Sequence, residues 1–412
     1  MLTEIGKRVK NASAQLAVAS TEDKNRILMA IAAALRENCE KIVKANEVDL
    51  QNGRNNGLSE ALLDRLMLNN DRVEGMAKGV EDVVALPDPV GKILWETERP
   101  NGMKIQRVSS PLGVVGIIYE ARPNVTSDAA ALCIKTGNTA ILRGGKEAFN
   151  SNSAIMDIMR EAIEKAGFNP DIVELVRDTS RESSTALMRM NEYVDVLIPR
   201  GSANLIKAVV QNSTVPVIET GAGNCHVYVD EFADIDMAVE IINNAKTRRI
   251  SVCNTAESLI IHKNIAEFAL IAIKAKLDEK NVILYGDEVA CEICPDIEKA
   301  TEEDWAKEYL DYKLSVKIVS SIDEAIEHIR KYSTHHSESI VTESLENAEK
   351  FLNEVDSAAI YHNVSTAFTD GGEFGFGAEI GISTQKLHAR GPLGLEQLNS
   401  FKYKIYGNGQ VR

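Results

Sequence analysis

The spacing of apolar residues predicts two different structures within the first part of the chain. Residues 1 to about 90 place Leu, Ile, Met and Ala at helical spacing, and Ser20 precedes a long run of this kind in the position of an N-cap. Residues 92–110 instead hold two short runs, the second alternating apolar with polar, on either side of Pro-Asn-Gly at 100–102. We therefore expect helices followed by a β-hairpin.

From Pro111 onward, short apolar runs alternate with amphipathic runs. This alternation predicts a mostly parallel, doubly wound sheet, whose ligands bind at the carboxyl ends of its strands. The Gly-Ala-Gly of residues 221–223 marks the point where the chain crosses into a second domain, in which the alternation resumes. The expected strands are 114–119, 139–142, 172–176, 194–198, 215–218, 226–229, 258–262 and 358–361, and the expected helices are 127–135, 153–165, 182–190, 202–211, 235–246 and 265–277.

These patterns predict an α/β protein with two doubly wound domains. Residues 1–91 and 111–221 would form the first domain, and residues 222–395 the second. Residues 92–110 and 396–412 would form an arm and a tail used in assembly. The tail alternates from Leu398 to Tyr406, as an edge strand does, so it could pair with the arm or with another subunit.

Composition narrows the possible function classes. The chain has 412 residues, of which 44% are hydrophobic and 26% charged, as is usual for a globular enzyme. Its net charge of −15 disfavours a nucleic acid or an anionic membrane as partner. We find no apolar signal core and no run of roughly 18 apolar residues, so we expect a cytoplasmic protein. Six scattered cysteines suit a reducing compartment better than a disulfide framework.

Sequence motifs for common cofactors are incomplete. No GxGxxG follows an expected strand, and the Gly-Gly-Lys of residues 144–146 lacks the hydroxyl residue and the spacing of a Walker loop. Cys291 and Cys294 have CxxC spacing, but no second pair accompanies them and no HExxH occurs. We therefore predict no metal site, and the motifs alone leave nucleotide binding open.

Residues 246–257 contain the candidate nucleophile. Cys253 lies in a polar stretch between an expected helix and an expected strand, shortly after Arg248 and Arg249. Guanidinium charges or a helix N-terminus lower the pKa of a thiol and so favour the nucleophilic thiolate. Asn254 and Thr255 are suited to cap a short helix here, which would direct N–H groups at the sulfur. On composition alone, a small buried cysteine is the commoner alternative.

Several long segments resemble the aldehyde dehydrogenase superfamily, in the same order and over essentially the whole chain. They are residues 111–126, 136–146, 219–226 (Glu-Thr-Gly-Ala-Gly-Asn-Cys-His) and 323–340. The match is closest to the branch that reduces L-glutamyl 5-phosphate to L-glutamate 5-semialdehyde in proline biosynthesis. The resemblance implies an NADP-binding first domain and a second domain that carries the nucleophile. This family binds its nicotinamide cofactor without GxGxxG, in agreement with the missing motif.

The resemblance assigns catalytic roles to two residues. Cys253 matches the thiol that attacks the activated carbonyl and holds the acyl group as a thioester. Asn124 matches the asparagine whose side-chain amide forms an oxyanion hole with the cysteine N–H. Two such donors stabilise the alkoxide by several kcal/mol. Without the resemblance, a turn residue after Pro123 explains Asn124 equally well.

The same resemblance identifies candidate cofactor contacts. Arg143 and Lys146 match the contact to the adenosine ribose, where relatives usually carry a glutamate at the position of Lys146. Two cations would accept a 2′-phosphate, so NADPH is expected rather than NADH. Gly201 and Ser202 match a turn near the cofactor diphosphate, at the start of an expected helix. Glu308 falls where relatives hold the nicotinamide ribose.

Further residues of the matching segments have less defined roles. Glu219 matches the general base of oxidising relatives, but a reductase of an acyl phosphate needs no hydrolytic water, so its role is open. Gly221 and Gly223 are expected to make backbone turns close to the cofactor. Candidates for contacts to the phosphate or the carboxylate of the substrate are Arg122, Arg249, His226 and His388, although a salt bridge or cap explains any of them as well.

Other functions remain compatible with these residues. The scaffold could instead oxidise an aldehyde or transfer its acyl group to coenzyme A. A cysteine hydrolase or acyltransferase would use Cys253 with a histidine base and no nicotinamide, and an inactive scaffold would leave Cys253 with ordinary thiol reactivity. As partners we expect a second copy of the chain, giving a dimer or a larger homo-oligomer, and a glutamate 5-kinase that hands over its labile product.

Overall fold

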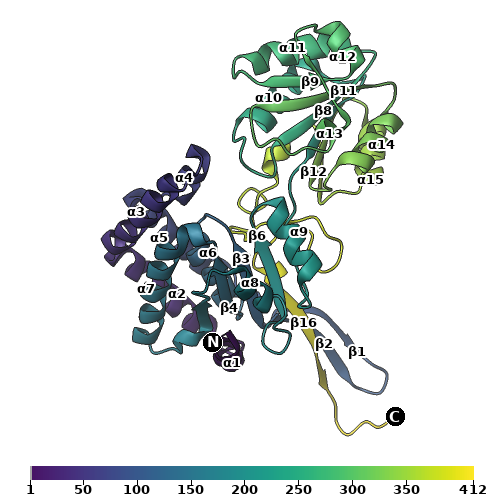
Figure 1. Ribbon diagram of the computed structural model, residues 1–412. Helices are drawn as coiled ribbons and strands as arrows, with labels where there is room; N and C mark the ends of the chain where they lie inside the picture. The colour runs from purple at the N-terminus through teal and green to yellow at the C-terminus, as the bar shows by residue number, and fades with distance from the viewer. Residues whose placement is uncertain (1) are drawn as a thin grey trace. The chain divides into compact units, whose positions relative to one another are not determined.

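The computed structural model describes residues 2–412, except for the side chain of Ala61, and the chain forms two compact units (Figure 1). Unit 1 comprises Met1–Thr220, Gly375–Gly381 and Leu393–Arg412. Unit 2 comprises Gly221–Phe374 and Ile382–Pro392. Both units are built from parallel sheets and helices, so the predicted α/β class is confirmed. The chain therefore returns to unit 1 twice after it has entered unit 2.

A four-stranded parallel sheet forms the centre of unit 1, with the strand order β5-β4-β3-β6. The chain runs from β3 outward to β5 and then returns to the other side of β3, so the order reverses beside β3. Ligands of doubly wound sheets bind at the carboxyl ends of the strands at such a reversal. The strands are β3 (Val114–Tyr119), β4 (Thr139–Gly144), β5 (Val173–Leu175) and β6 (Val196–Arg200).

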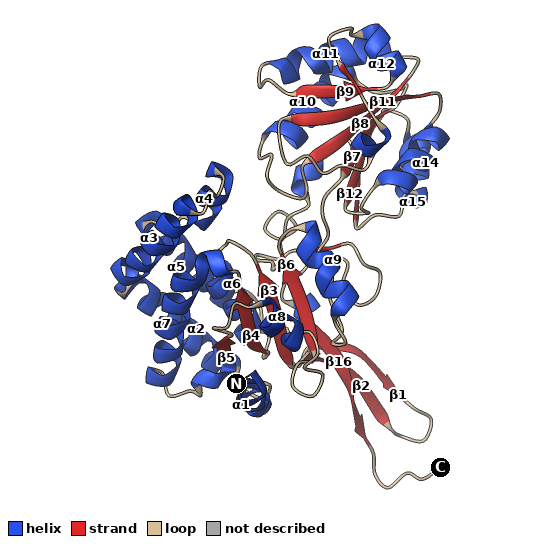
Figure 2. Ribbon diagram, in the orientation of Figure 1, coloured by secondary structure: helices blue, strands red, loops and turns tan. Residues whose placement is uncertain are grey.

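Helices cover both faces of this sheet. Ile5 and Val9 of α1 pack with Val114, Ile141 and other apolar residues of β3, β4 and β6 on one face, together with α8 and α9. Helices α6 and α7 cover the other face, and α2 packs against α5 and α7 (Figure 2). The helices are α1 (Leu2–Leu16), α2 (Thr21–Glu37), α3 (Cys39–Asn55), α4 (Glu60–Leu66), α5 (Asn70–Ala85), α6 (Val125–Lys135), α7 (Phe149–Lys165), α8 (Arg181–Leu187) and α9 (Ala203–Asn212), with 3₁₀ turns η1 (Lys146–Ala148), η2 (Pro170–Ile172) and η4 (Glu396–Leu398).

Side-chain hydrogen bonds fix the N-termini of α2 and α7. Ser20 accepts a hydrogen bond from the backbone N–H of Asp23 and caps α2, as the sequence predicts. The buried carboxylate of Asp49 accepts from the backbone N–H groups of Asn150 and Ser151 in the first turn of α7. A carboxylate at this end also interacts favourably with the helix dipole. Helix α3, which carries Asp49, is thereby fixed to α7.

The predicted hairpin is present and forms an arm with the C-terminal strand. Strands β1 (Ile93–Glu98) and β2 (Lys104–Pro111) are antiparallel, and Gly102 has the positive φ, 83°, that their turn requires. Strand β16 (Asn399–Tyr406) pairs along the whole of β2 (Figure 1). The tail therefore pairs with the hairpin of its own chain. Strands β14 (Ile382–Ser383) and β15 (Gly391–Pro392) form a separate two-stranded sheet.

Unit 2 contains a seven-stranded parallel sheet in the order β10-β9-β11-β8-β7-β12-β13. Helices α10 and α11 cover one face, and α14 and α15 cover the other (Figure 2). The elements are β7 (Cys225–Val229), α10 (Ile235–Thr247), β8 (Ala256–His262), α11 (Ala266–Asp278), β9 (Ile283–Gly286), α12 (Glu288–Ile293), β10 (Glu298–Lys299), α13 (Glu302–Trp305), β11 (Lys313–Val319), α14 (Ile322–Tyr332), β12 (Ser337–Val341), α15 (Leu345–Glu354), β13 (Ala359–His362) and η3 (Thr366–Phe368).

One expected strand does not form. Residues 215–218 make a single bridge to β6, between Val217 and Leu197. Pro216 lies within this run and has no N–H to donate to a neighbouring strand, which explains why the pairing does not extend. Among the described residues, no helix is long and apolar enough to cross a membrane, no group of acidic, His or Cys side chains is arranged to hold a metal ion, and no disulfide joins any of the six cysteines.

Candidate active site

Three predicted site residues of unit 2 lie in loops that enter adjacent strands. Gly223 precedes β7, Cys253 precedes β8 and Glu308 precedes β11, and these strands are neighbours in the parallel sheet. The N–H of Gly223 donates to the carboxylate of Glu308 at 2.7 Å. A Cβ atom added at Gly223 would lie 1.5 Å from the carbonyl oxygen of Cys253. The backbones of Gly223 and Cys253 are thus in direct contact, with the Glu308 carboxylate beside them.

The turn that carries Cys253 is anchored through Cys253 and the residue after it. The thiol of Cys225 donates to the carbonyl of Cys253 at 3.2 Å, and the hydroxyl of Thr366 donates to the carbonyl of Asn254 at 2.8 Å. The side chain of Asn254 donates to the carbonyls of Ala367 and Thr369. The prediction of a short helix capped by Asn254 is therefore wrong: residues 251–255 form turns and bends. Its amide is used as a donor to η3 instead of as a cap.

A buried ion pair lies at the base of this segment. Nζ of Lys246, in the last turn of α10, is 2.5 Å from Oε2 of Glu257 in β8, and both side chains are fully buried. Burial raises the pKa of Glu257 and lowers that of Lys246, while the attraction between the two opposes both shifts. The other carboxylate oxygen of Glu257 accepts from the N–H of Leu310, two residues after Glu308. The pair therefore joins both ends of the cysteine segment to the Glu308 loop.

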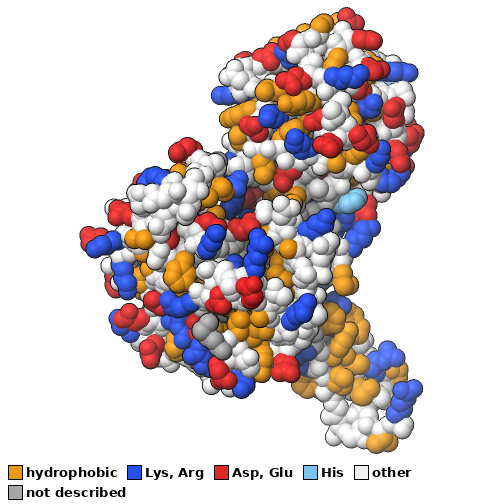
Figure 3. Space-filling model, in the orientation of Figure 1, with side chains coloured by type: hydrophobic (Ala, Val, Ile, Leu, Met, Phe, Trp, Pro, Cys, Tyr) orange, Lys and Arg blue, Asp and Glu red, His pale blue; other side chains and the backbone are white. Residues whose placement is uncertain are grey.

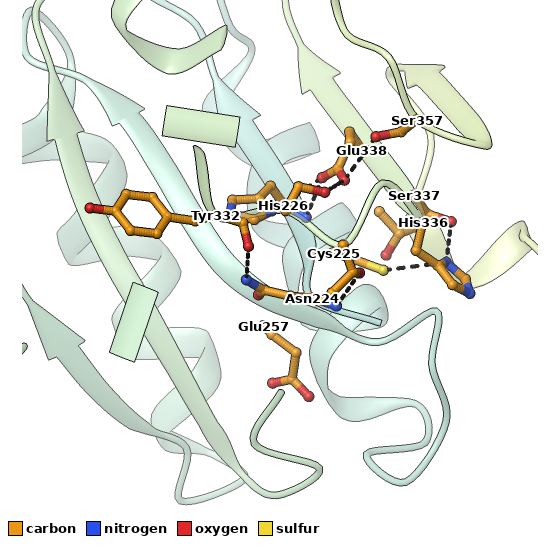
Figure 4. Close-up of polar contacts among 12 residues, drawn as sticks. Asn224, Cys225, His226, Glu257, Tyr332, His336, Ser337, Glu338 and Ser357 are labelled. Carbon is orange, nitrogen blue, oxygen red and sulfur yellow. Dashed lines mark hydrogen bonds and ion pairs between the residues drawn. The ribbon is translucent and has the colours of Figure 1, made fainter. Parts of the chain in front are cut away.

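A polar cluster lies beside this segment in the interior of unit 2 (Figure 4). The Glu338 carboxylate accepts from the backbone N–H of His226 at 2.7 Å and lies 3.2 Å from Nδ1 of the same residue. His226 has no exposed surface and packs edge-on against His328, whose pKa is lowered to about 3 by burial. The ring of His226 is therefore enclosed by protein side chains and has no surface on which a substrate could contact it.

The carboxyl ends of β3 and β6 in unit 1 meet at the N-terminus of α9. Ser202 caps α9 with its side chain, and its N–H donates to the carboxylate of Glu120 at 2.7 Å. A Cβ atom at Gly201 would lie 2.5 Å from the same carboxylate. Gly201 therefore leaves room for an anionic group at this end of α9, and Glu120 is the group that lies there.

Asn124 precedes α6 but does not cap it. Its backbone is helical, its side chain accepts no capping hydrogen bond, and its Nδ2 donates to Oδ2 of Asp128 at 2.8 Å. Burial raises the pKa of Asp128 to about 6. The interpretation of Asn124 as a simple turn residue is thus incomplete, because its amide has a specific partner one turn into the helix. This partner has the i, i+4 spacing of a helical pair.

The two candidate contacts to the adenosine ribose differ in their surroundings. The guanidinium of Arg143 is half-buried and donates to the carbonyls of Thr179 and Ser180 at 2.6 and 3.0 Å. Burial lowers its pKa. Lys146 is exposed and begins η1, just after β4. Arg143 therefore has structural partners of its own, and Lys146 is the cation that extends toward solvent.

The remaining predicted residues are distributed over both units. Gly221 donates its N–H to the carbonyl of Ile382, and a Cβ there would meet Thr384 at 2.5 Å. Arg249 is exposed, and its carbonyl accepts from the Thr255 hydroxyl. His388 is exposed with a φ of 69°. Arg122 and Glu219, both half-buried, lie in unit 1.

The predicted residues fall into two groups, one in each unit. Unit 2 brings together Cys253, Gly223 and Glu308, and unit 1 brings Ser202 and Gly201 to one end of its sheet. Asn124 belongs to unit 1, so its pairing with Cys253 remains a prediction. Sequence reasoning did not identify Asp128, Glu120 or the Lys246–Glu257 pair as site residues. The i, i+4 spacing from Asn124 was the available signal for Asp128.

Comparison with known proteins shows the family. The sequence profile of the aldehyde dehydrogenase family matches residues 3–312. The chain belongs to the aldehyde dehydrogenase family. A solved aldehyde dehydrogenase of the acetylating type, from Geobacillus thermoglucosidasius, has 18% sequence identity and a TM-score of 0.70 over 100% of this chain and 97% of that one, which shows the common fold.

Closer relatives lie in one branch of the aldehyde dehydrogenase family. A protein of Clostridium perfringens named gamma-glutamyl phosphate reductase is 59% identical over 408 residues, which are 99% of this chain and 98% of the relative. A Lachnospira eligens protein of the same name is 56% identical over 100% of this chain and 99% of its own length. The crystal structure of gamma-glutamyl phosphate reductase from Thermotoga maritima has 48% identity and a TM-score of 0.98, with 100% and 99% coverage. The similarity therefore extends over both units.

Proposed function

We propose that this protein is a gamma-glutamyl phosphate reductase of proline biosynthesis. It reduces L-glutamyl 5-phosphate to L-glutamate 5-semialdehyde, with release of phosphate. The observation that supports this proposal most directly is the anchored turn of Cys253, in contact with Gly223 and beside the Glu308 carboxylate. The full-length similarity to proteins of that name supplies the substrate class.

Cys253 acts as the nucleophile in the proposed reaction. Its thiolate forms a bond to the activated carbonyl carbon, the bond from that carbon to the phosphate oxygen breaks, and phosphate leaves with the electron pair. The product is a thioester on Cys253. After reduction of the thioester carbon, the oxyanion of the thiohemiacetal re-forms the carbonyl and the carbon–sulfur bond breaks, which releases the aldehyde and the thiolate. Asn124 donates to the oxyanion with its side-chain amide.

The residues of unit 1 fit a nicotinamide dinucleotide. The N-terminus of α9 offers N–H donors to an oxyanion: the carboxylate of Glu120 accepts from Ser202 there, and a diphosphate would take the place of that carboxylate. When bound, NADPH supplies two electrons and a proton equivalent as hydride to the thioester carbon. Lys146 is exposed at the end of β4, where its charge would attract a 2′-phosphate. We therefore propose NADPH over NADH, and Glu308 as the carboxylate that holds the nicotinamide ribose.

The experiment that tests this function compares Cys253→Ala with the unchanged protein in both directions. Forward turnover is followed as NADPH absorbance, and reverse turnover as phosphate-dependent reduction of NADP or NAD with the semialdehyde. We expect a loss of at least about 10³-fold in Cys253→Ala, because a covalent step cannot proceed without its nucleophile. NADPH binding, measured by fluorescence titration, is expected to be unchanged.

Cys291→Ala is the matched control for this substitution. Like Cys253, Cys291 is partly exposed, belongs to unit 2 and forms no disulfide, and burial raises its pKa. Its replacement is expected to leave turnover within about twofold, since surface substitutions away from a site have small effects. Undiminished turnover in Cys253→Ala, or turnover with coenzyme A in place of phosphate, would contradict the proposed reaction.

We also propose that the arm mediates self-association. Trp95, Tyr403 and Ile405 are about half exposed on one face of the sheet β1-β2-β16, and Figure 3 shows hydrophobic side chains gathered over the arm. An apolar surface on an antiparallel sheet with an open edge favours a partner. We propose a second copy of this chain as that partner. A glutamate 5-kinase that delivers the labile acyl phosphate is a second proposed partner.

A further inference from the structure

Asp128 is a half-buried acid without a cationic partner among the described residues of its own unit. It lies in the first turn of α6. Its hydrogen-bond partners are Nδ2 of Asn124, at 2.8 Å, and the hydroxyl of Ser127, at 3.3 Å. Both are neutral groups. Among the described residues of unit 1, no Lys, Arg or His side chain forms an ion pair with its carboxylate, so burial is the main influence on its pKa.

Helix stability alone does not explain this arrangement. The dipole of α6 favours an acid in the first turn, but an exposed acid satisfies that preference at no desolvation cost, as Asp71 does in α5. A carboxylate that loses part of its hydration and gains no counter-ion destabilises the fold. Such groups are typical of sites in which a ligand supplies the missing charge.

We propose that Asp128 is the counter-ion of the α-ammonium group of the substrate. This inference rests on the proposed function, in which the amide of Asn124 donates to the reacting carbonyl. The amide has two N–H groups, so it donates one to Asp128 and keeps the other for the carbonyl oxygen. Nδ2 of Asn124 and Oδ2 of Asp128 are 2.8 Å apart. A glutamyl chain that places its carbonyl oxygen on the first has its amino group within reach of the second.

The proposal gives Asp128 a role in specificity. A charge-assisted hydrogen bond between an ammonium group and a carboxylate is stronger at a half-buried side chain than at a fully exposed one, because less water competes for it. The ammonium group restores the charge balance that the free protein lacks. An aldehyde of the same length without the amino group leaves the acid uncompensated, so the site discriminates against it.

The test measures the reverse reaction of Asp128→Asn with two aldehydes. One is L-glutamate 5-semialdehyde, and the other is 5-oxopentanoate, which has the same chain without the amino group. We expect kcat/KM to fall about 10- to 100-fold for the first aldehyde, mostly through KM, as for the loss of a hydrogen bond to a charged group. For the second aldehyde we expect a change below about threefold.

Two outcomes overturn the proposal. Equal losses with both aldehydes would show that Asp128 acts only through Asn124 or the fold, and no loss with either would show that it binds nothing. Asp71→Asn is the control for the helix dipole and should change neither value, because Asp71 is exposed in the first turn of α5. If the unchanged enzyme acts on neither aldehyde, the proposed function itself has failed, which is a distinct result.

Asp128→Asn is expected to fold. The pKa of Asp128 in the native state, about 6, is higher than its ordinary value of 3.8, so the native state binds the proton more tightly than the unfolded chain. The stability that the proton contributes is therefore present at low pH and is lost as pH rises from about 4 to 6. At pH 8 the neutral amide avoids this cost, and the thermal midpoint should be equal to or above that of the parent. NADPH fluorescence titration should give an unchanged Kd.

Discussion

Gly223 is the residue that most directly fixes the position of the proposed nucleophile. Its Cα lies against the backbone of Cys253, and its N–H is held by Glu308. The need for glycine here comes from close approach, since no side chain fits into a space where a Cβ would overlap a carbonyl group. The positions of the Cys253 thiol and of the Glu308 carboxylate thus both depend on the backbone at Gly223.

Replacement of Gly223 by alanine should misplace Cys253. Because the added Cβ would overlap backbone atoms, the cysteine turn has to move, and a displacement of about 1 Å at a reacting atom costs about 100-fold in turnover. We expect a loss of that size in kcat, with slower alkylation of Cys253 by iodoacetamide. Gly75→Ala is the control, because a Cβ at that exposed helical position meets nothing within 4 Å. Equal kcat values for the two variants would contradict the contact.

The sequence identifies the candidate site residues, but it does not predict the hydrogen-bond partners of their side chains. Cys253, Asn124 and Glu308 were identified by resemblance, and the neighbourhood of Cys253 and Glu308 then followed from three parallel strands. The partners of Asn124 and Asn254 were not predicted, because an amide serves equally well as a cap, a turn residue or a donor to a distant loop. Only the fold decides among these uses.

A single buried ion pair holds the two ends of the segment between α10 and β8 together. The buried ion pair Lys246–Glu257 joins the last turn of the helix to the start of the strand, and Cys253 lies between them. A buried pair contributes little net stability compared with apolar residues, whereas the loss of one partner leaves an uncompensated charge. We infer that the pair fixes how α10 and β8 meet.

Lys246→Met should therefore destabilise the protein, and a second substitution should restore it. The single variant leaves Glu257 buried without its partner, at a cost of about 3–5 kcal/mol in the free energy of unfolding. Lys246→Met/Glu257→Gln removes both charges and keeps an oxygen for the N–H of Leu310, so its free energy should return to within about 1.5 kcal/mol of the parent. Urea denaturation gives these values.

The surface pair Lys78–Asp82 provides the control for that cycle. It has the helical i, i+4 spacing and both side chains are more than half exposed, so Lys78→Met should change the free energy of unfolding by less than about 0.5 kcal/mol. A loss in the double Lys246/Glu257 variant as large as in the single one would show that packing, not charge, holds the segment.

The elements themselves were largely predictable, for local reasons. Helices α2 and α10 have helical apolar spacing and N-caps, strands β3 and β8 are short apolar runs, and all four lie where the sequence predicts them. The exceptions occur at residues whose hydrogen bonding the pattern of apolar and polar positions does not predict. Pro216 limits the expected strand at 215–218 to one bridge, and Asn254 donates to η3 where a helix start was expected. Pro216 acts through the N–H that it lacks, whereas the partners of Asn254 lie more than a hundred residues along the chain.

For the whole molecule, the pairing of distant segments gives the arm its two unlike faces. In the sheet, Tyr403 lies opposite Arg107, which lies opposite Trp95, and Ile405 lies opposite Ile105. Residues directly opposite each other share a face. One face is thus rich in apolar side chains, whereas Lys402 and Lys404 alternate onto the other face. This surface exists only because the tail and the hairpin, far apart in sequence, form one sheet.

Charges placed on the apolar face should disrupt the proposed assembly. Tyr403→Glu/Ile405→Glu removes two half-exposed apolar side chains, and full burial of each contributes about 1.5–3 kcal/mol to association. The dimer dissociation constant should rise by at least about 100-fold, measured as mass by light scattering over a range of concentrations. Lys402→Glu, on the opposite face of the same strand, should leave the mass unchanged. A monomeric parent, or a double variant that associates as the parent does, would mean that the arm has another purpose.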